Sequence, residues 1–186
     1  MVPLSALWLP ILLSAVIVFV ASSLIHMVLG YHKGDYQKLP NEEKALEAMR
    51  SLGLAPGSYH FPYCPSHKEM KTPEHTEKLK KGPVGLLTII PTGMPNMGKY
   101  LGAWFAYTVV VSFFVAYLAG RTLGPGTPYL AVFRVAGTMA FLSYAMAHAH
   151  SSIWKGESWS TTLKFYFDGL VYGLLTAGVF GWLWPR

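Results

Sequence analysis

Residues 4–30 read LSALWLPILLSAVIVFVASSLIHMVLG, a run that contains no Asp, Glu, Lys or Arg. A helix needs about 20 apolar residues to cross a hydrocarbon core about 30 Å thick. The run is longer than this and lacks the basic start of a secretory signal, so we predict an uncleaved transmembrane helix. The same criterion predicts three more spans, at residues 100–120, 129–149 and 163–184.

The composition agrees with a membrane protein. Only 13% of the residues are charged and 52% are hydrophobic, whereas a soluble domain has about 25% charged residues. We therefore predict an all-α membrane protein, a single polytopic domain over residues 1–186, with the lipid bilayer as its surroundings. The single cysteine, Cys64, excludes an intramolecular disulfide and any metal site that needs several thiolates.

A long polar loop, residues 31–99, separates the first two predicted spans and is predicted to be partly helical. NEEKALEAMRSLGL predicts a short amphipathic helix with Asn41 as its N-cap, and TPEHTEKLKKG predicts a second helix. APGSYHFPYCP reads as an irregular loop. The apolar residues 84–97 are interrupted by prolines and are too few to span, so they predict an interfacial or re-entrant strip.

Lysine and arginine are distributed unequally between the two sides of the predicted bundle. Of the 15 such residues, the side with the long loop and the turn between the third and fourth spans holds all but three. The opposite side has only Arg121 and Arg186, and Arg134 lies inside a span. The positive-inside rule therefore predicts a cytoplasmic loop and both termini on the other side. This distribution also accounts for the net charge of +6, and no nucleic-acid motif is present.

Ionisable residues inside spans are costly and indicate function. Depth along the helices places His26, His148 and Asp168 in one layer near the cytoplasmic face. Residues two apart on a helix point about 200° from each other, so His148 is expected to face inward and His150 the headgroups. His32 follows just outside the first span.

Three interpretations of this layer remain open. It could bind zinc or another divalent metal, or a heme through a histidine. It could relay protons or conduct ions, because imidazole titrates near neutral pH. It could also be only a hydrogen-bonded polar layer at the membrane interface. A weaker candidate for a soft-metal site lies in the loop, where Cys64 occurs with His60 and His67.

Two other features predict contacts with lipid or with a neighbouring helix. Arg134 is about 17 Å in depth from Asp168, so it is expected to reach outward to lipid phosphate rather than to form an ion pair. Small residues recur on one face of the fourth span at Gly169, Gly173, Ala177 and Gly181. Such a ridge permits close packing, either within the chain or against a partner subunit.

The stretches SSLIHMVLGYHKGDYQKLPNEEKALEAMR, GPVGLLTIIPTGMPNMGK and SIWKGESWSTTLKFYFDGLVYGLLTAGVFGWLW resemble an uncharacterised family of four-helix bacterial inner-membrane proteins. The resemblance implies a bacterial inner-membrane location but no activity. No nucleotide-binding loop, Ser-His-Asp set or nucleophile motif occurs in the sequence. The leading hypothesis is therefore a non-catalytic protein, an accessory subunit of a larger complex or a homo-oligomer. The alternatives are the metal- or heme-binding protein and the conduit.

Overall fold

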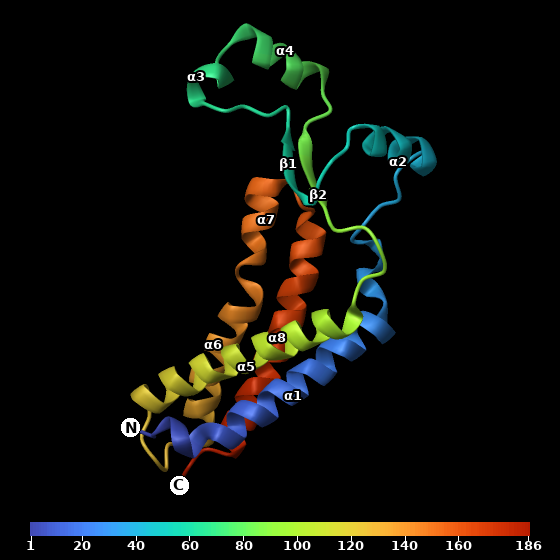
Figure 1. The fold of residues 1–186 in the computed structure, drawn as a ribbon. Coiled ribbons are helices and arrows are strands. Elements are labelled where there is room, and N and C mark those ends of the chain that lie inside the picture. Colours follow the sequence, from blue (N-terminus) through green and yellow to red (C-terminus); the bar gives the residue numbers. More distant parts are fainter. The chain divides into compact units, whose positions relative to one another are not determined.

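The computed structural model describes residues 1–186 and divides into two compact units (Figure 1). The first unit contains Met1–Asp35, Asn96–Ile153 and Glu157–Arg186. The second contains Tyr36–Pro95 and Trp154–Gly156.

The first unit is a bundle of long helices, and it begins with α1, Trp8–Leu24. A 3-10 turn, Leu4–Leu7, precedes α1, and a π-helical turn, Ile25–Leu29, follows it. The helix α5 covers Met97–Thr122. Its N-cap is Asn96, whose side chain accepts a hydrogen bond from the backbone amide of Lys99.

The remaining helices of the bundle are α6, Tyr129–Ala145, α7, His148–Lys155, and α8, Trp159–Trp182. Four helical segments, with α6 and α7 taken as one, are long and apolar enough to cross a membrane, so the chain is a multi-pass integral membrane protein. The prediction of an all-α membrane protein with four spans is confirmed.

The helices α6 and α8 pack closely because small residues face each other (Figure 1). A Cβ atom added to Gly169 would lie 2.7 Å from the Cβ of Ala145, and one added to Gly137 would lie 3.0 Å from the Cβ of Ala177. Such distances permit no larger side chain without a shift of the backbone. The small-residue ridge of α8 therefore packs within the chain, and it is not free to contact lipid or a partner subunit.

The remaining two ridge glycines follow the same pattern. A Cβ atom on Gly173 would lie 3.2 Å from the carbonyl oxygen of Gly137, and one on Gly181 would lie 2.6 Å from the ring of Tyr129. Both neighbours belong to α6. The ridge is thus in contact with α6 along most of its length.

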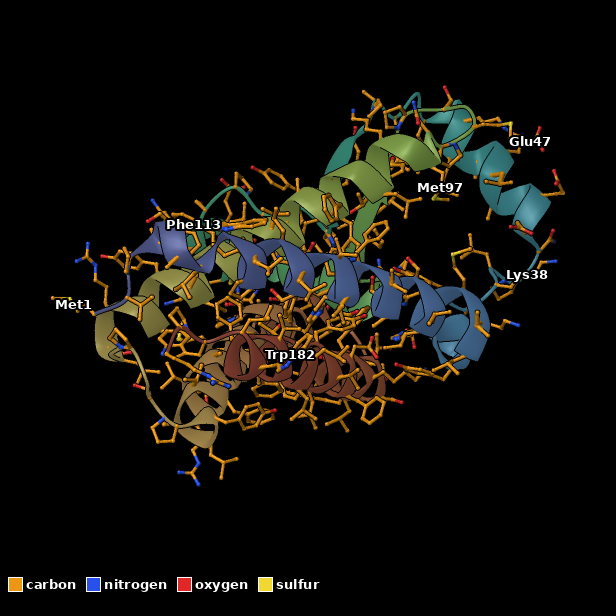
Figure 2. All side chains as sticks on the ribbon, turned by 90° about the horizontal axis from the view of Figure 1, so that it is seen from below. Met1, Lys38, Glu47, Met97, Phe113 and Trp182 are labelled. Atoms are coloured by element: carbon orange, nitrogen blue, oxygen red, sulfur yellow. The ribbon has the colours of Figure 1, made fainter.

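The helices α1 and α5 complete the bundle and lie side by side (Figure 2). They contact each other through polar as well as apolar side chains. The buried hydroxyl of Ser14 on α1 donates to that of Ser112 on α5 over 3.0 Å. The indole of Trp104 on α5 donates to the hydroxyl of Ser22 over 2.7 Å. Both pairs satisfy polar atoms that would otherwise be unpaired away from water.

The second unit contains the two predicted helices and, in addition, a short helix and a pair of strands that were not predicted. Helices α2, Glu42–Ser51, and α4, Pro73–Lys81, lie in the two stretches with helical patterns. Asn41 stands at the start of α2, but with φ +52° its side chain makes no capping hydrogen bond, so that part of the prediction is wrong. A short helix, α3, covers His67–Met70.

Besides α3, the unpredicted structure is an antiparallel pair of strands. The strand β1, Gly57–Phe61, pairs with β2, Gly85–Ile89, with Tyr59 opposite Leu87. The prediction of an irregular loop at β1 is wrong. Residues 85–89 of the apolar strip form β2, and an interfacial or re-entrant position for the strip stays a prediction. Each strand supplies the other with the backbone hydrogen bonds that a single extended strip would lack.

Candidate metal centre

The site is built around Asp168, a carboxylate buried in the first half of α8 with 1% of its surface exposed. One oxygen, Oδ1, accepts a hydrogen bond from the hydroxyl of Tyr31. The other, Oδ2, lies 2.8 Å from Nε2 of His32. A buried carboxylate needs such partners, because its transfer from water to a low-dielectric interior is costly.

Tyr31 and His32 reach Asp168 because the chain turns back at the end of the first span. Gly30 adopts φ +65°, a left-handed conformation that favours glycine. The 3-10 turn Tyr31–Gly34 follows at once and directs both rings toward α8. Burial, followed by the hydrogen bond to Asp168, raises the pKa of Tyr31, so its hydroxyl keeps the proton that it donates.

The other ring nitrogen of His32 has its own carboxylate partner. Nδ1 lies 2.5 Å from Oδ2 of Asp35, and the ammonium of Lys164 donates to Oδ1 of Asp35 over 2.5 Å. Burial of Asp35 opposes ionisation, but the hydrogen bonds from Lys164 and His32 outweigh it and hold the pKa of this carboxyl below its ordinary value. Asp35 is therefore an anion that fixes the orientation of the His32 ring.

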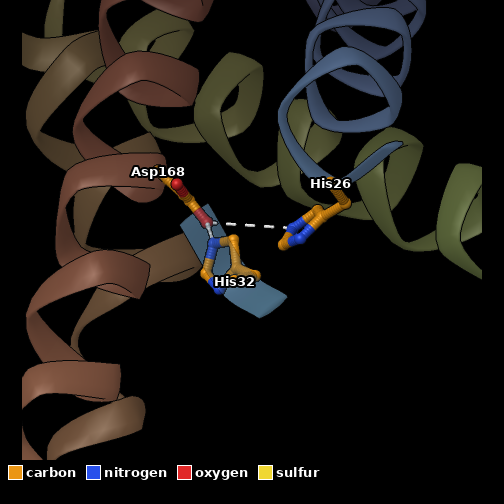
Figure 3. A group of neighbouring side chains, drawn as sticks. All are labelled: His26, His32 and Asp168. Carbon is orange, nitrogen blue, oxygen red and sulfur yellow. Dashed lines mark hydrogen bonds and ion pairs between the residues drawn. The ribbon is translucent and has the colours of Figure 1, made fainter. Parts of the chain in front are cut away.

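His26 completes the cluster from the π-helical turn. Its Nε2 lies 3.8 Å from Oδ2 of Asp168, and the centroid of its ring lies 4.5 Å from the centroid of the His32 ring (Figure 3). The three candidate ligand atoms of His26, His32 and Asp168 all lie within 4.8 Å of one another. Tetrahedral bonds of about 2.0 to 2.2 Å place ligand atoms about 3.3 to 3.6 Å apart. Small side-chain movements would therefore bring the three to a common metal ion.

His148 was predicted in the same layer, and it contacts a different partner. Its ring stacks on Phe165 of α8 with 4.2 Å between centroids and 5° between planes. It is half-buried and lines a cavity beside Asp168, but it forms no hydrogen bond or ion pair with that carboxylate. His150, two residues later, is exposed.

The soft-metal candidate in the loop does not assemble. His60 lies on β1, Cys64 lies beyond that strand, and His67 begins α3. The thiol of Cys64 donates to the carbonyl of Ser66 over 3.2 Å. These three residues do not form a group of neighbouring metal-ligand atoms, so the structure does not bring the predicted set together.

Arg134 lies apart from the cluster, as its depth predicts. It is exposed on α6 and forms no salt bridge with Asp168. It borders a cavity of about 300 Å³ whose other walls include Phe141 and Leu174.

Three residues of the site were not predicted from the sequence, namely Tyr31, Asp35 and Lys164. The spacing of residues in the sequence could have indicated two of them, Asp35 and Lys164. His32 and Asp35 are three residues apart, and Lys164 and Asp168 are four apart, which are spacings that place side chains on the same face of a helical turn. Tyr31 has no comparable signal, because only the turn at Gly30 brings it to α8.

Comparison with known proteins assigns the chain to no family. No family model, curated protein or solved structure matches the chain.

Proposed function

We propose that this membrane protein binds a divalent transition-metal ion through His26, His32 and Asp168, and that zinc is the metal that fits best. The observation that carries the proposal is the convergence of two imidazoles and one carboxylate within 4.8 Å. Zinc takes imidazole nitrogen and carboxylate oxygen in tetrahedral sites. Three protein ligands leave one position for water or another molecule.

The surroundings of His32 support this assignment. A histidine that binds a metal through one nitrogen commonly donates its other N–H to a carboxylate, which fixes the ring and raises its basicity. Asp35 occupies that position at 2.5 Å from Nδ1, and Lys164 and His32 together hold it ionised. A metal ion would take the place of the proton that Nε2 of His32 otherwise shares with Asp168.

The hypothesis of an accessory subunit or homo-oligomer has less support. It rested on the small-residue ridge of α8, and Gly169, Gly173 and Gly181 pack against α6 within the chain. The conduit has less support as well. The hydrogen-bonded chain runs from Lys164 through Asp35, His32 and Asp168 to Tyr31. It does not extend to Tyr172, one turn further along α8, whose hydroxyl has no partner.

We further propose a bacterial inner membrane as the location and a cytoplasmic position for the metal-binding end of the bundle. The Lys and Arg excess on the side of the long loop supports this orientation. Lys164, at the metal-binding end, belongs to that side.

The test is metal analysis of the full-length protein purified in mild detergent. The protein is loaded with zinc, freed of unbound metal and analysed by inductively coupled plasma mass spectrometry. We expect one zinc per chain in the wild type and less than a tenth of that in His32→Ala. His150→Ala, which removes an exposed histidine near the same end, should retain one zinc.

A cobalt-substituted sample adds a readout of geometry. Tetrahedral cobalt(II) absorbs visible light much more strongly than octahedral cobalt(II), and imidazole ligands give that band its position. The absorption spectrum also shows whether heme is present. A metal-free sample, or equal zinc content in wild type and His32→Ala, would contradict the proposal.

A further inference from the structure

A cavity of about 490 Å³ lies beside the proposed metal ligands, within the helical unit. Side chains from α1 and its π-helical turn, α5, α6, α7 and α8 line it. His26 and Asp168 border the cavity, whereas His32 does not line it. Its volume suits a molecule of drug size, so the cavity is large enough for more than the metal and a water molecule.

Three aromatic side chains form one wall of the cavity. The ring centroids of Trp104 and Tyr144 are 6.3 Å apart, those of Trp104 and Tyr172 are 6.4 Å apart, and those of the two tyrosines are 5.4 Å apart. We call Trp104, Tyr144 and Tyr172 the aromatic cage. The negative faces of aromatic rings attract cations, and cages of this kind recognise quaternary ammonium groups.

The charge of the lining favours the same class of ligand. Asp168 is the only residue of the lining with a carboxylate, and no Lys or Arg lines the cavity. Asp168 also precedes Tyr172 by one helical turn, so the carboxylate and the cage lie on the same side of α8. An anionic amphiphile such as a fatty acid would meet a carboxylate and no cation. A cation would lie beside three aromatic rings and close to the carboxylate of Asp168, whose oxygens also contact Tyr31 and His32. The remaining titratable residues of the lining are His26 and His148.

The cage also carries polar atoms without partners. The hydroxyl groups of Tyr144 and Tyr172 are buried and have no hydrogen-bond partner, and the two residues are only 6% and 4% exposed. Buried polar atoms of this kind are rare in folded proteins. Each of these hydroxyl oxygens therefore has lone pairs without a partner in the protein.

The outer lining of the cavity is apolar. Met27 is 79% exposed, Met97 is 62% exposed and Leu101 is 39% exposed. All three belong to candidate membrane spans. A ligand here would have apolar substituents around its charge.

We infer that this cavity binds a lipophilic organic monocation, such as a quaternary ammonium or phosphonium ion, with its charge between the aromatic cage and Asp168. The inference uses the cage and the cavity, and it shares only Asp168 and His26 with the proposed metal site. Because both ligands are cations near Asp168, zinc and the organic cation compete.

The experiment measures binding of radiolabelled tetraphenylphosphonium to the full-length protein in nanodiscs of zwitterionic lipid, with a chelator present. We expect one saturable site per chain. Trp104→Leu should weaken binding about 5- to 30-fold, which is the range expected for loss of a desolvated cation–π contact. Trp182→Leu, which removes a tryptophan that is 74% exposed, should bind like the wild type.

Two variants of opposite charge at the same position distinguish an effect on cation binding from an effect on folding. Leu101→Lys should weaken binding about 5-fold or more, and Leu101→Glu should bind at least as tightly as the wild type. Absence of saturable binding, equal binding by Trp104→Leu and Trp182→Leu, or equal effects of the two Leu101 variants would overturn the inference. Displacement of the probe by laurate at equal concentration would also overturn it.

The two proposals fail separately. His32→Ala should lose zinc and still bind tetraphenylphosphonium, because His32 does not line the cavity. Trp104→Leu should keep zinc and lose most of the affinity for the organic cation. If zinc binds but does not displace the probe, the shared position at Asp168 is wrong and so is the inference.

Discussion

Nδ1 of His32 lies 2.5 Å from Oδ2 of Asp35, and Nε2 of the same ring lies 2.8 Å from Oδ2 of Asp168. Each ring nitrogen of His32 therefore has a carboxylate oxygen within hydrogen-bond distance. A metal ion bound at Nε2 would leave Nδ1 to donate its hydrogen to Asp35. In the proposed metal site, Asp35 would orient the ring of His32 without binding the ion itself.

Asp35→Asn should weaken zinc binding about 10- to 100-fold, because loss of an outer carboxylate commonly has an effect of this size on metal affinity. The ligand set His26, His32 and Asp168 remains intact in this variant. The measurement is a competitive titration against a zinc-binding dye. Glu43→Gln, an exposed change on α2, is the control and should leave affinity unchanged. Wild-type affinity in Asp35→Asn would show that Asp35 does not orient the ring.

Asp168→Ala should lower the stability of the metal-free protein by about 3 kcal/mol, the range seen when one partner of a buried charged pair is removed. The change leaves the hydroxyl of Tyr31 and Nε2 of His32 without their acceptor. Equilibrium unfolding in mixed micelles measures the free energy. Thr138→Ala, at an exposed position of α6, provides the reference for an uninvolved polar side chain. Similar stabilities of the two variants would argue against a structural role for the network.

Gly169→Ala should destabilise the bundle by about 1 to 3 kcal/mol, because overpacking a close contact forces the backbone to move. The new Cβ atom would lie 2.7 Å from that of Ala145 and 3.2 Å from two backbone atoms of the same residue. Gly102→Ala on α5 is the matched control, since no atom lies within 4 Å of its Cβ position. The control should be as stable as the wild type, or slightly more stable. The same unfolding experiment compares the two.

The spans could be predicted from the sequence because length and lack of charge are local properties. Residues 4–30, 100–120, 129–149 and 163–184 each correspond to one helical segment of the bundle. The pairing of β1 with β2 could not be predicted in this way. Residues 57–61 and 85–89 become strands only in each other's presence, and the intervening chain is long enough to hold two helices, α3 and α4.

The depth of the site residues along their helices could be predicted, but which of their side chains meet could not. Counting about 1.5 Å per residue places His26 and His148 at the level of Asp168, but the direction of each side chain depends on helix phase. The π-helical turn at Ile25–Leu29 changes the phase around His26, and the helix is interrupted between α6 and α7, just before His148. His32 takes part because Gly30 reverses the chain.

Gly30→Ala should reduce zinc affinity and stability together. A left-handed φ costs a residue with a Cβ atom roughly 1 to 2 kcal/mol, and the turn at Gly30 brings Tyr31 and His32 to Asp168. Gly34→Ala is the control, because Gly34 has no positive φ and no atom within 4 Å of its Cβ position. Thermal unfolding and the dye titration provide the two readouts. Wild-type zinc affinity in Gly30→Ala would show that the turn does not need this conformation.

Cys64 should react with a membrane-impermeant maleimide in inverted vesicles and not in intact cells. It is the only cysteine of the chain and lies in the second unit, which the Lys and Arg distribution assigns to the cytoplasm. A long loop follows the positive-inside rule less reliably than a short one, so the experiment decides the orientation. A Cys64→Ser, Pro125→Cys double variant should show the reverse pattern, because residue 125 lies in the turn between α5 and α6. Labelling of Cys64 in intact cells would place the metal-binding end of the bundle outside, where a different compartment would supply its ion.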